Sequence, residues 1–370
     1  MAALLSGGCS RPAPPAPPAP AKDPFYFFTA YPAGKHPTFI ATGDLNNDRV
    51  PDLVTVNMGG DSISILLGNE EGTFHEAVVQ GVGQRPRGLA LADFNGDRRL
   101  DAAVVNVDSR DVSILLGKGD GTFTLASTYE TETAPMAAAA GDLNEDGKTD
   151  LLIARKMADA VLVFIGHGDG TFRQTARFNP GDTPTSLVLA DLNGDHHLDV
   201  AVANNGTMTS DVALFFGDGR GNFRLGDRLP TGLRPVFVTQ GDVNGDGHPD
   251  LVVVNGIRNA LSIFLGNGRG VFRPAEPLGA EAGPAAAVVA DFDGDGRADL
   301  AVVNQLANSL SILIGRGDGT FLQPPINYNA GNGPFSLALV PIAGSRPGIA
   351  VANNAAGSVS LFLSKVRAVR

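Results

Sequence analysis

Six short segments of this 370-residue chain carry the residues whose types and spacing could do chemistry. Each is nine residues long, begins and ends with Asp, and has oxygen-bearing side chains at positions 1, 3, 5 and 9. In a turn like that of an EF-hand, these side chains converge with the carbonyl of position 7 on one hard cation. Ligation by oxygen alone, without His or Cys side chains, disfavours zinc and copper, and magnesium prefers to keep its waters. The pattern therefore predicts calcium.

The predicted ligands are the side chains at positions 1, 3, 5 and 9 and the carbonyl at position 7 of each segment. In chain order they are Asp44, Asn46, Asp48, Val50 and Asp52; Asp93, Asn95, Asp97, Arg99 and Asp101; Asp142, Asn144, Asp146, Lys148 and Asp150; Asp191, Asn193, Asp195, His197 and Asp199; Asp242, Asn244, Asp246, His248 and Asp250; and Asp291, Asp293, Asp295, Arg297 and Asp299. A single copy could be no more than a good turn. Six copies in phase favour up to six calcium sites.

The six sites should differ in affinity. Position 6 is expected to take a positive φ, which suits the glycine of the third, fifth and sixth segments. The same backbone conformation costs more free energy at Arg49, Arg98 and His196, which occupy position 6 of the other three segments. We therefore expect the third, fifth and sixth loops to bind calcium most tightly. The aligned stretch of the last unit, Val340 to Gly348, has no carboxylate. We expect that unit to be free of metal.

The elements that position these loops form a repeat of near 50 residues. The first Asp residues are 49, 49, 49, 51 and 49 residues apart, and a second motif, a Gly-rich turn followed by Phe, recurs in phase with them. In the second unit the pattern predicts strands over 87–93, 101–106, 111–117 and 123–129. The apolar runs are too short for helices, so a four-stranded propeller blade is favoured over a leucine-rich, helical or mixed helical repeat.

The two ends of the repeat region complete one another. A strand beginning at Phe25 precedes the first unit without a hairpin of its own, and the seventh unit stops at a third strand, 358–363. We therefore predict an all-β, seven-bladed β-propeller over 25–364, closed by the N-terminal strand, with a tail at 365–370. A closed ring of this kind is expected to be monomeric.

Residues 1–9 resemble the end of a bacterial lipoprotein signal, in which Cys9 would become lipidated. Residues 10–24 form a Pro- and Ala-rich tether, expected to be an extended spacer. An unprocessed N-terminus is the alternative. Since there is no run of 18 apolar residues, we expect contact with a membrane only through a lipid on Cys9. The protein is expected outside the cytoplasm, as a lipoprotein anchored at the membrane or cell surface, or secreted.

Composition excludes several classes of function. The net charge is -11 and the pI is near 4.9, which argues against nucleic-acid binding through a basic stripe. The single Cys excludes an intramolecular disulfide framework and a zinc cluster built on cysteine. The prominent carboxylates are all repeated and assigned to the loops, and no nucleophile stands beside a base, so we expect no enzymatic activity.

The two motifs occur in pairs, such as ILLGKGDGTF ending at Phe123 and DLNEDGKTD beginning at Asp142. These pairs resemble the FG-GAP or VCBS-type repeats of the integrin alpha-subunit propeller and of bacterial surface proteins. The resemblance covers Phe25 to about Leu363. It implies a seven-bladed propeller with calcium between the first and second strands of a blade, on the face opposite the usual ligand-binding one. Arg49, Arg98, His196 and the seventh loop depart from the pattern.

The functional prediction is a calcium-binding, surface-tethered, non-catalytic module for adhesion, binding or scaffolding, with a protein or glycan ligand. The alternatives are an enzyme, or a module serving one, that acts on polysaccharide, and a lectin. The predicted ligand face consists of the loops between second and third strands and the Pro-containing turns. These are Asn106 to Asp111, Arg155 to Ala160 and Asn204 to Asp211, with Pro37, Pro86, Pro135, Pro184, Pro235, Pro284 and Pro334.

Overall fold

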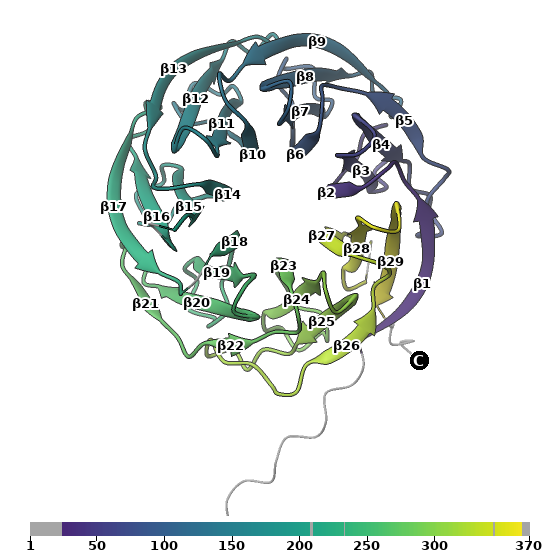
Figure 1. Ribbon diagram of the computed structural model, residues 1–370, viewed down its shortest axis with the longest axis vertical. Coiled ribbons are helices and arrows are strands. Elements are labelled where there is room, and N and C mark those ends of the chain that lie inside the picture. The colour runs from purple at the N-terminus through teal and green to yellow at the C-terminus, as the bar shows by residue number, and fades with distance from the viewer. Residues whose placement is uncertain (1–23, 208–209, 233, 343–344, 365–370) are drawn as a thin grey trace, which may run out of the picture.

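The protein is a ring of seven antiparallel sheets arranged around a central axis (Figure 1). This computed structural model describes residues 24–207, 210–232, 234–342 and 345–364. Every regular element within those ranges is a strand, and no helix there could span a membrane. The predicted signal, Cys9, the tether except residue 24, and the tail at 365–370 lie outside the described residues, so these assignments remain predictions.

Each of the first six blades takes four consecutive strands, with the first strand innermost in the ring (Figure 1). Blades 1 to 3 consist of β2 (Pro37–Gly43), β3 (Asp52–Asn57), β4 (Ser62–Leu66) and β5 (Val78–Gly81); β6 (Pro86–Ala92), β7 (Asp101–Asn106), β8 (Asp111–Gly117) and β9 (Phe123–Glu130); and β10 (Pro135–Gly141), β11 (Asp150–Arg155), β12 (Ala160–Gly166) and β13 (Phe172–Phe178). Blades 4 to 6 consist of β14 (Pro184–Ala190), β15 (Asp199–Asn205), β16 (Ser210–Gly217) and β17 (Phe223–Pro230); β18 (Pro235–Gly241), β19 (Asp250–Asn255), β20 (Ala260–Gly266) and an outer strand in two pieces, β21 (Phe272–Pro274) and β22 (Leu278–Gly279); and β23 (Pro284–Ala290), β24 (Asp299–Asn304), β25 (Ser309–Leu313) and β26 (Ile326–Asn329).

The seventh blade joins the two ends of the chain and closes the ring. It consists of β27 (Pro334–Val340), β28 (Gly348–Asn353), β29 (Ser358–Ser364) and, as its outer strand, β1 (Phe25–Pro32). β1 pairs antiparallel with β29, with Phe25 opposite Ser364. The predicted seven-bladed propeller and its closure by the N-terminal strand are confirmed.

The core lies between neighbouring blades. Second strands such as β7 are buried along their whole length, because both faces of a blade pack against its neighbours. The position-2 residues of the six predicted calcium loops are also buried and apolar, so each loop is anchored in an interblade core. These residues are Leu45, Phe94, Leu143, Leu192, Val243 and Phe292. Packing therefore fixes the start of every loop and leaves its polar side chains at the surface.

Candidate functional site

The six predicted calcium loops all connect the first strand of a blade to its second strand, and so share one face of the ring. The fifth loop shows how the side chains are held. Asp242 accepts backbone hydrogen bonds from Gly245 (2.7 Å) and Gly247 (2.8 Å). The position-3 amide oxygen of Asn244 accepts from the Asp246 N–H (2.9 Å), and Asp246 accepts from the His248 N–H (2.9 Å). The chain thus winds around its own polar side chains, which turn toward the inside of the loop.

The last Asp of each loop has a second role that the sequence did not reveal. Asp250 is fully buried, and its two carboxylate oxygens accept hydrogen bonds from the Val243 N–H (2.9 Å) and the Gly266 N–H (2.7 Å). The equivalent Asp makes the same pair of bonds in all six loops. It therefore ties the start of the loop to the end of the third strand. Each oxygen keeps a further lone pair with which it could ligate a cation.

Electrostatics favour a cation in these loops. The pKa of Asp199, Asp250 and Asp299 is raised to about 6, chiefly by burial; the two backbone donors lower it, and the other carboxylates of each loop contribute a smaller increase. The corresponding Asp of the first three loops has its pKa raised by the same causes. A buried carboxylate beside like charges is stabilised in its ionised form when a cation lies among them.

The sixth loop holds the densest acidic cluster in the described part of the chain. Ligand atoms of Asp291, Asp293 and Asp299 all lie within 4.8 Å of one another, and no other group of three His, Cys, Asp or Glu residues in that part meets the same condition. The sixth loop is the one with Asp at position 3, where the other five have Asn. Burial and the neighbouring Asp295 raise the pKa of Asp293. These residues fit a divalent cation.

Backbone conformation confirms one expectation about the loops and adds another. Position 6 has a positive φ, including 68° at Arg49, 65° at Arg98 and 71° at His196. Position 4 has a positive φ as well, including 61° at Asn47 and 58° at Glu145. The signal for position 4 was present in the sequence, since the other four loops have Gly there. The third loop therefore carries a side chain at a strained position, whereas the fifth and sixth have Gly at both.

A hydrogen bond between blades explains why the two sequence motifs keep the same spacing. In five of the loops, the carbonyl of position 2 accepts a hydrogen bond from a glycine in the Gly-rich hairpin of the next blade, as between Phe94 and Gly170 (3.0 Å). Blade 7 has no such hairpin. There the guanidinium of Arg346, from the loop at Val340 to Gly348, donates to the carbonyl of Phe292 (3.0 Å). Each predicted metal loop is thus also a contact between neighbouring blades.

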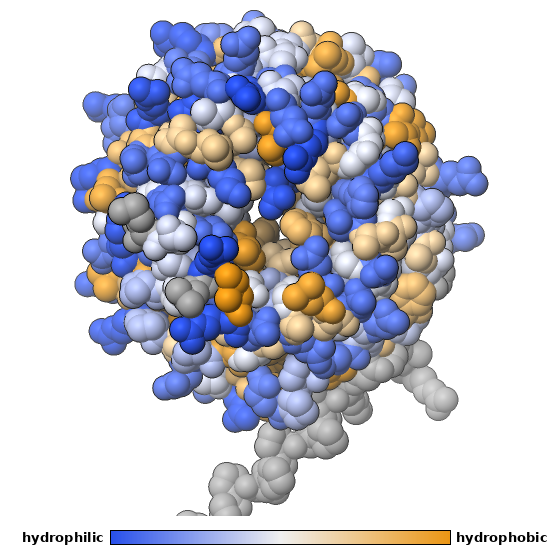
Figure 2. All heavy atoms as spheres, viewed as in Figure 1, coloured by the Kyte–Doolittle hydropathy of each residue, from blue (hydrophilic) through white to orange (hydrophobic). Residues whose placement is uncertain are grey.

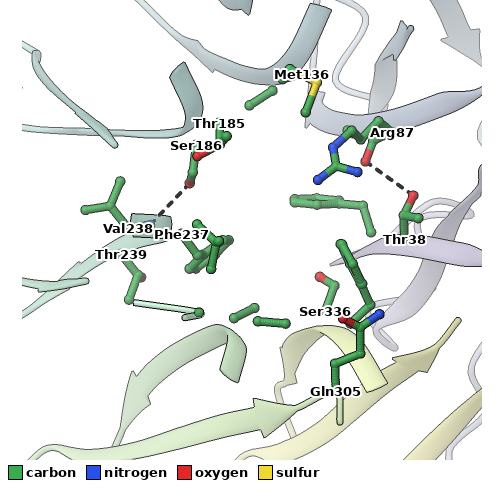
Figure 3. A pocket seen from close by; sticks show the side chains of 18 of the residues that line it. Thr38, Arg87, Met136, Thr185, Ser186, Phe237, Val238, Thr239, Gln305 and Ser336 are labelled. Carbon is green, nitrogen blue, oxygen red and sulfur yellow. Dashed lines mark hydrogen bonds between the residues drawn. The ribbon is translucent and has the colours of Figure 1, made fainter. Parts of the chain in front are cut away.

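A pocket of about 420 Å³ occupies the centre of the ring, at the end of the innermost strands that lies away from the predicted calcium loops (Figures 2 and 3). Its walls include Thr38, Arg87, Met136 and Thr185, each of which directly follows one of the prolines assigned to the ligand face. The turns belong to the predicted ligand face, but the residues that line the pocket were not predicted individually.

Comparison with known proteins identifies the repeats. A family model described as FG-GAP-like repeat matches residues 44–104, 93–153, 142–202, 197–253, 242–302 and 291–344. No curated protein matches this sequence.

Several solved structures share the architecture. BBS1N, in its complex with ARL6DN, is 11% identical, with 93% of this chain and 98% of that chain covered and a TM-score of 0.66. A protein from Lactobacillus plantarum is 16% identical, with 83% and 88% covered and a TM-score of 0.64. The periplasmic gluconolactonase PpgL of Pseudomonas aeruginosa is 18% identical, with 83% and 88% covered and a TM-score of 0.61.

The likeness to a gluconolactonase corrects one prediction. The expectation that the chain is not an enzyme was wrong, because a protein with this architecture is an enzyme in Pseudomonas aeruginosa. That expectation rested on the lack of a nucleophile beside a base and on the assignment of the recurring carboxylates to the loops. In a propeller, however, the residues around the central pocket come from different blades, here about 49 residues apart. Spacing along the chain therefore does not exclude a catalytic set.

Proposed function

The chain belongs to the FG-GAP-like repeat family, and on that premise we propose that it is a calcium-stabilised propeller that binds a protein or glycan partner on the face opposite its calcium loops. The geometry of the six loops is the observation that carries the proposal. In all six, the first Asp accepts the position-6 N–H and the last Asp is buried between two backbone donors. Calcium would join the acidic side chains of each loop to a contact between blades.

Calcium binding is tested by counting ions bound to the full chain and by thermal unfolding in millimolar Ca²⁺ and in EGTA. We expect three to six ions per chain and a higher Tm in Ca²⁺. If no ion is bound and the two melting curves coincide, the six loops are turns and the calcium part of the proposal is withdrawn.

Exposed apolar side chains support the opposite face as a binding surface. Met157, Ile257 and Leu306 are 76%, 58% and 75% exposed. Each lies two residues beyond the end of the second strand of its blade, in the loop before the third strand. Exposed apolar residues gathered on one face are typical of protein interaction sites. BBS1N, which shares the architecture, forms a complex with a protein, ARL6DN.

The binding face is tested with two matched variants of the full chain, screened on arrays of purified proteins and glycans. One changes Met157, Ile257 and Leu306 to Ser. The other changes three similarly exposed apolar residues of the outer strands to Ser, namely Val78, Val79 and Leu125. We expect binding to be lost in the first variant and kept in the second, with both at the wild-type Tm. Equal losses would refute the assignment of the face.

We also propose that residues 10–24 tether the ring to a membrane through a lipid on Cys9. The proposal rests on the resemblance of residues 1–9 to a lipoprotein signal and on the spacer that follows. Metabolic labelling with a palmitate analogue in a bacterial host should mark the wild type and leave Cys9→Ser unlabelled. Equal labelling of the two would refute it.

Hydrolysis of a sugar lactone is a second candidate function, favoured by the architectural likeness to PpgL. Water would add to the ring ester, the ester C–O bond would break, and an aldonate and a proton would be released. A pH-stat assay with glucono-1,5-lactone measures that proton directly. A rate above the uncatalysed one supports the candidate, and a rate equal to it in both Ca²⁺ and EGTA rejects it.

A further inference from the structure

The residues that ring the central pocket are placed there by a repeated backbone irregularity. In every blade the innermost strand has a β-bulge between its first proline and the residue two positions later. A bulge redirects a side chain without ending the strand. The extra residues are Thr38, Arg87, Met136, Thr185, Val236, Ala285 and Phe335, and all seven line the pocket. The ring thus has seven equivalent positions, and they are filled by six different residue types, with Thr in two of them.

Arg87 is the one charged residue among the described residues that line the pocket. Its guanidinium lies toward the middle of the pocket in Figure 3. The guanidinium carbon is 5.5 Å from the centroid of the Phe335 ring. Within the described ranges no carboxylate forms an ion pair with this side chain. Arg85, two residues earlier, does form one, with 3.6 Å between its Nη1 and Oδ1 of Asp108. Burial, with a smaller effect of Arg85, lowers the pKa of Arg87. A cation enclosed in this way is stabilised by an anion.

We propose that the central pocket binds a small monocarboxylate, with the carboxylate on the Arg87 guanidinium. A guanidinium presents a planar pair of donors that matches a carboxylate in a bidentate contact. One cation balances one negative charge, so a monocarboxylate fits better than a doubly charged phosphate. The pocket has a size usual for small ligands.

The other walls define the body of the ligand. Phe237, Phe335 and Met136 supply apolar surface. Thr38 and Thr185 contribute hydroxyl groups, but their hydrogen bonds to backbone carbonyls are long, at 3.4 to 3.5 Å. Such hydroxyls can turn to a ligand at small cost. The favoured ligand therefore has one carboxylate on a mainly apolar, planar or unbranched body.

The test is isothermal titration of the full chain with sodium benzoate, with the neutral isostere benzamide, with hexanoate and with inorganic phosphate. We expect benzoate or hexanoate to bind and benzamide to bind far more weakly. Arg87→Met should weaken carboxylate binding by roughly 10- to 100-fold, the range for loss of a charged hydrogen bond. Met suits this position because Met136 occupies it in the next blade. Arg85→Met removes an equal charge from the exposed neighbour and should leave the affinity unchanged.

A second variant keeps the test decisive if Arg87→Met does not fold. Ala285→Phe retains the charge and fills the pocket from the opposite side, at a bulge position where Phe335 shows that Phe is accommodated. It should abolish carboxylate binding. The proposal is overturned if neither carboxylate binds the wild type, if phosphate binds more tightly, or if both variants keep wild-type affinity. The inference rests on the proposed use of this face for binding, but each readout is separate from calcium counting and from partner screening.

Discussion

The calcium proposal makes a prediction that one exposed side chain can decide. Asp246 is an exposed residue of the fifth loop. Its Oδ1 accepts a hydrogen bond from the His248 N–H (2.9 Å), and its Oδ2 accepts one from the side-chain amide of Asn244 (3.0 Å). Asp246→Asn keeps an oxygen for the His248 N–H and loses only the exposed hydrogen bond from the Asn244 side chain. The free energy of unfolding in EGTA should therefore change by no more than about 0.5 kcal/mol, as for most surface substitutions.

In calcium the same substitution removes a charged ligand. At about 1 mM Ca²⁺ and a dissociation constant of about 10⁻⁴ M, one filled site adds about 1.4 kcal/mol of stability. For a chain of this length, 1 kcal/mol moves Tm by about 1 to 2 °C. We expect Asp246→Asn to lower Tm by about 2 °C in Ca²⁺ and to leave it nearly unchanged in EGTA. Adding Asp295→Asn in the sixth loop should double the calcium-dependent loss, because distant sites add.

Differential scanning calorimetry in the two buffers measures these shifts. Asp227→Asn, on the outer strand β17, is the matched control and should behave like the wild type in both. An equal loss in Ca²⁺ and in EGTA would mean that Asp246 stabilises the turn by itself. No loss in either buffer would mean that the fifth loop holds no calcium at this concentration. Either result refutes the reasoning for this loop.

Three further substitutions test the backbone and the blade contacts. Arg49→Gly relieves a positive φ of 68° and should raise the free energy of unfolding by about 0.5 to 1 kcal/mol in urea denaturation; a lower midpoint would contradict the strain argument. Gly166→Ala would place a Cβ 2.2 Å from a backbone carbonyl oxygen and should cost about 2 kcal/mol, whereas Gly81→Ala meets no atom within 4 Å and should cost little in the same experiment. Arg346→Met removes the donor to the Phe292 carbonyl and should lower the free energy of unfolding by about 1 kcal/mol in EGTA. The loss should be smaller in Ca²⁺, because the substitution also removes a cation near the sixth loop. A larger loss in Ca²⁺ would contradict this.

The fold could be predicted from the sequence because the repeat states its own boundaries. The second unit was predicted as strands over 87–93, 101–106, 111–117 and 123–129, and the structure has strands within one residue of each. The unmatched strand predicted at Phe25 and the third strand with which the seventh repeat unit ends together predicted closure, since a propeller protects its edges by closing the ring. The repetition of the unit thus indicated the strand boundaries and the closure of the ring, which a single unit could not.

The details of the sites were less accessible, for physical reasons that differ between the two faces. The structural role of Asp250 depends on Gly266, which lies 16 residues further along the chain and comes near only when the third strand pairs. Arg87 had a signal that was not used. Arg87 directly follows Pro86, the first proline of its unit. When the seven units are aligned, it is the one charged residue at the position after this proline. The bulge that turns this position into the pocket is a property of strand pairing.

The two faces are joined through the same strands, and this allows a final prediction. β6 begins beside Arg87 in the pocket and ends beside Asp93, the first predicted ligand of the second loop. Six residues of strand span roughly 20 Å, which is more than twice the screening length of about 8 Å at physiological salt. Filling the loops with calcium would change the net charge from -11 to near neutral, but screening leaves little effect of that change on the electrostatic potential at the pocket.

Benzoate should therefore bind with the same affinity, within about twofold, in Ca²⁺ and in EGTA at 0.15 M salt. A larger effect that persists at higher salt would mean that calcium changes the blade geometry around Arg87, because a direct charge effect would be screened.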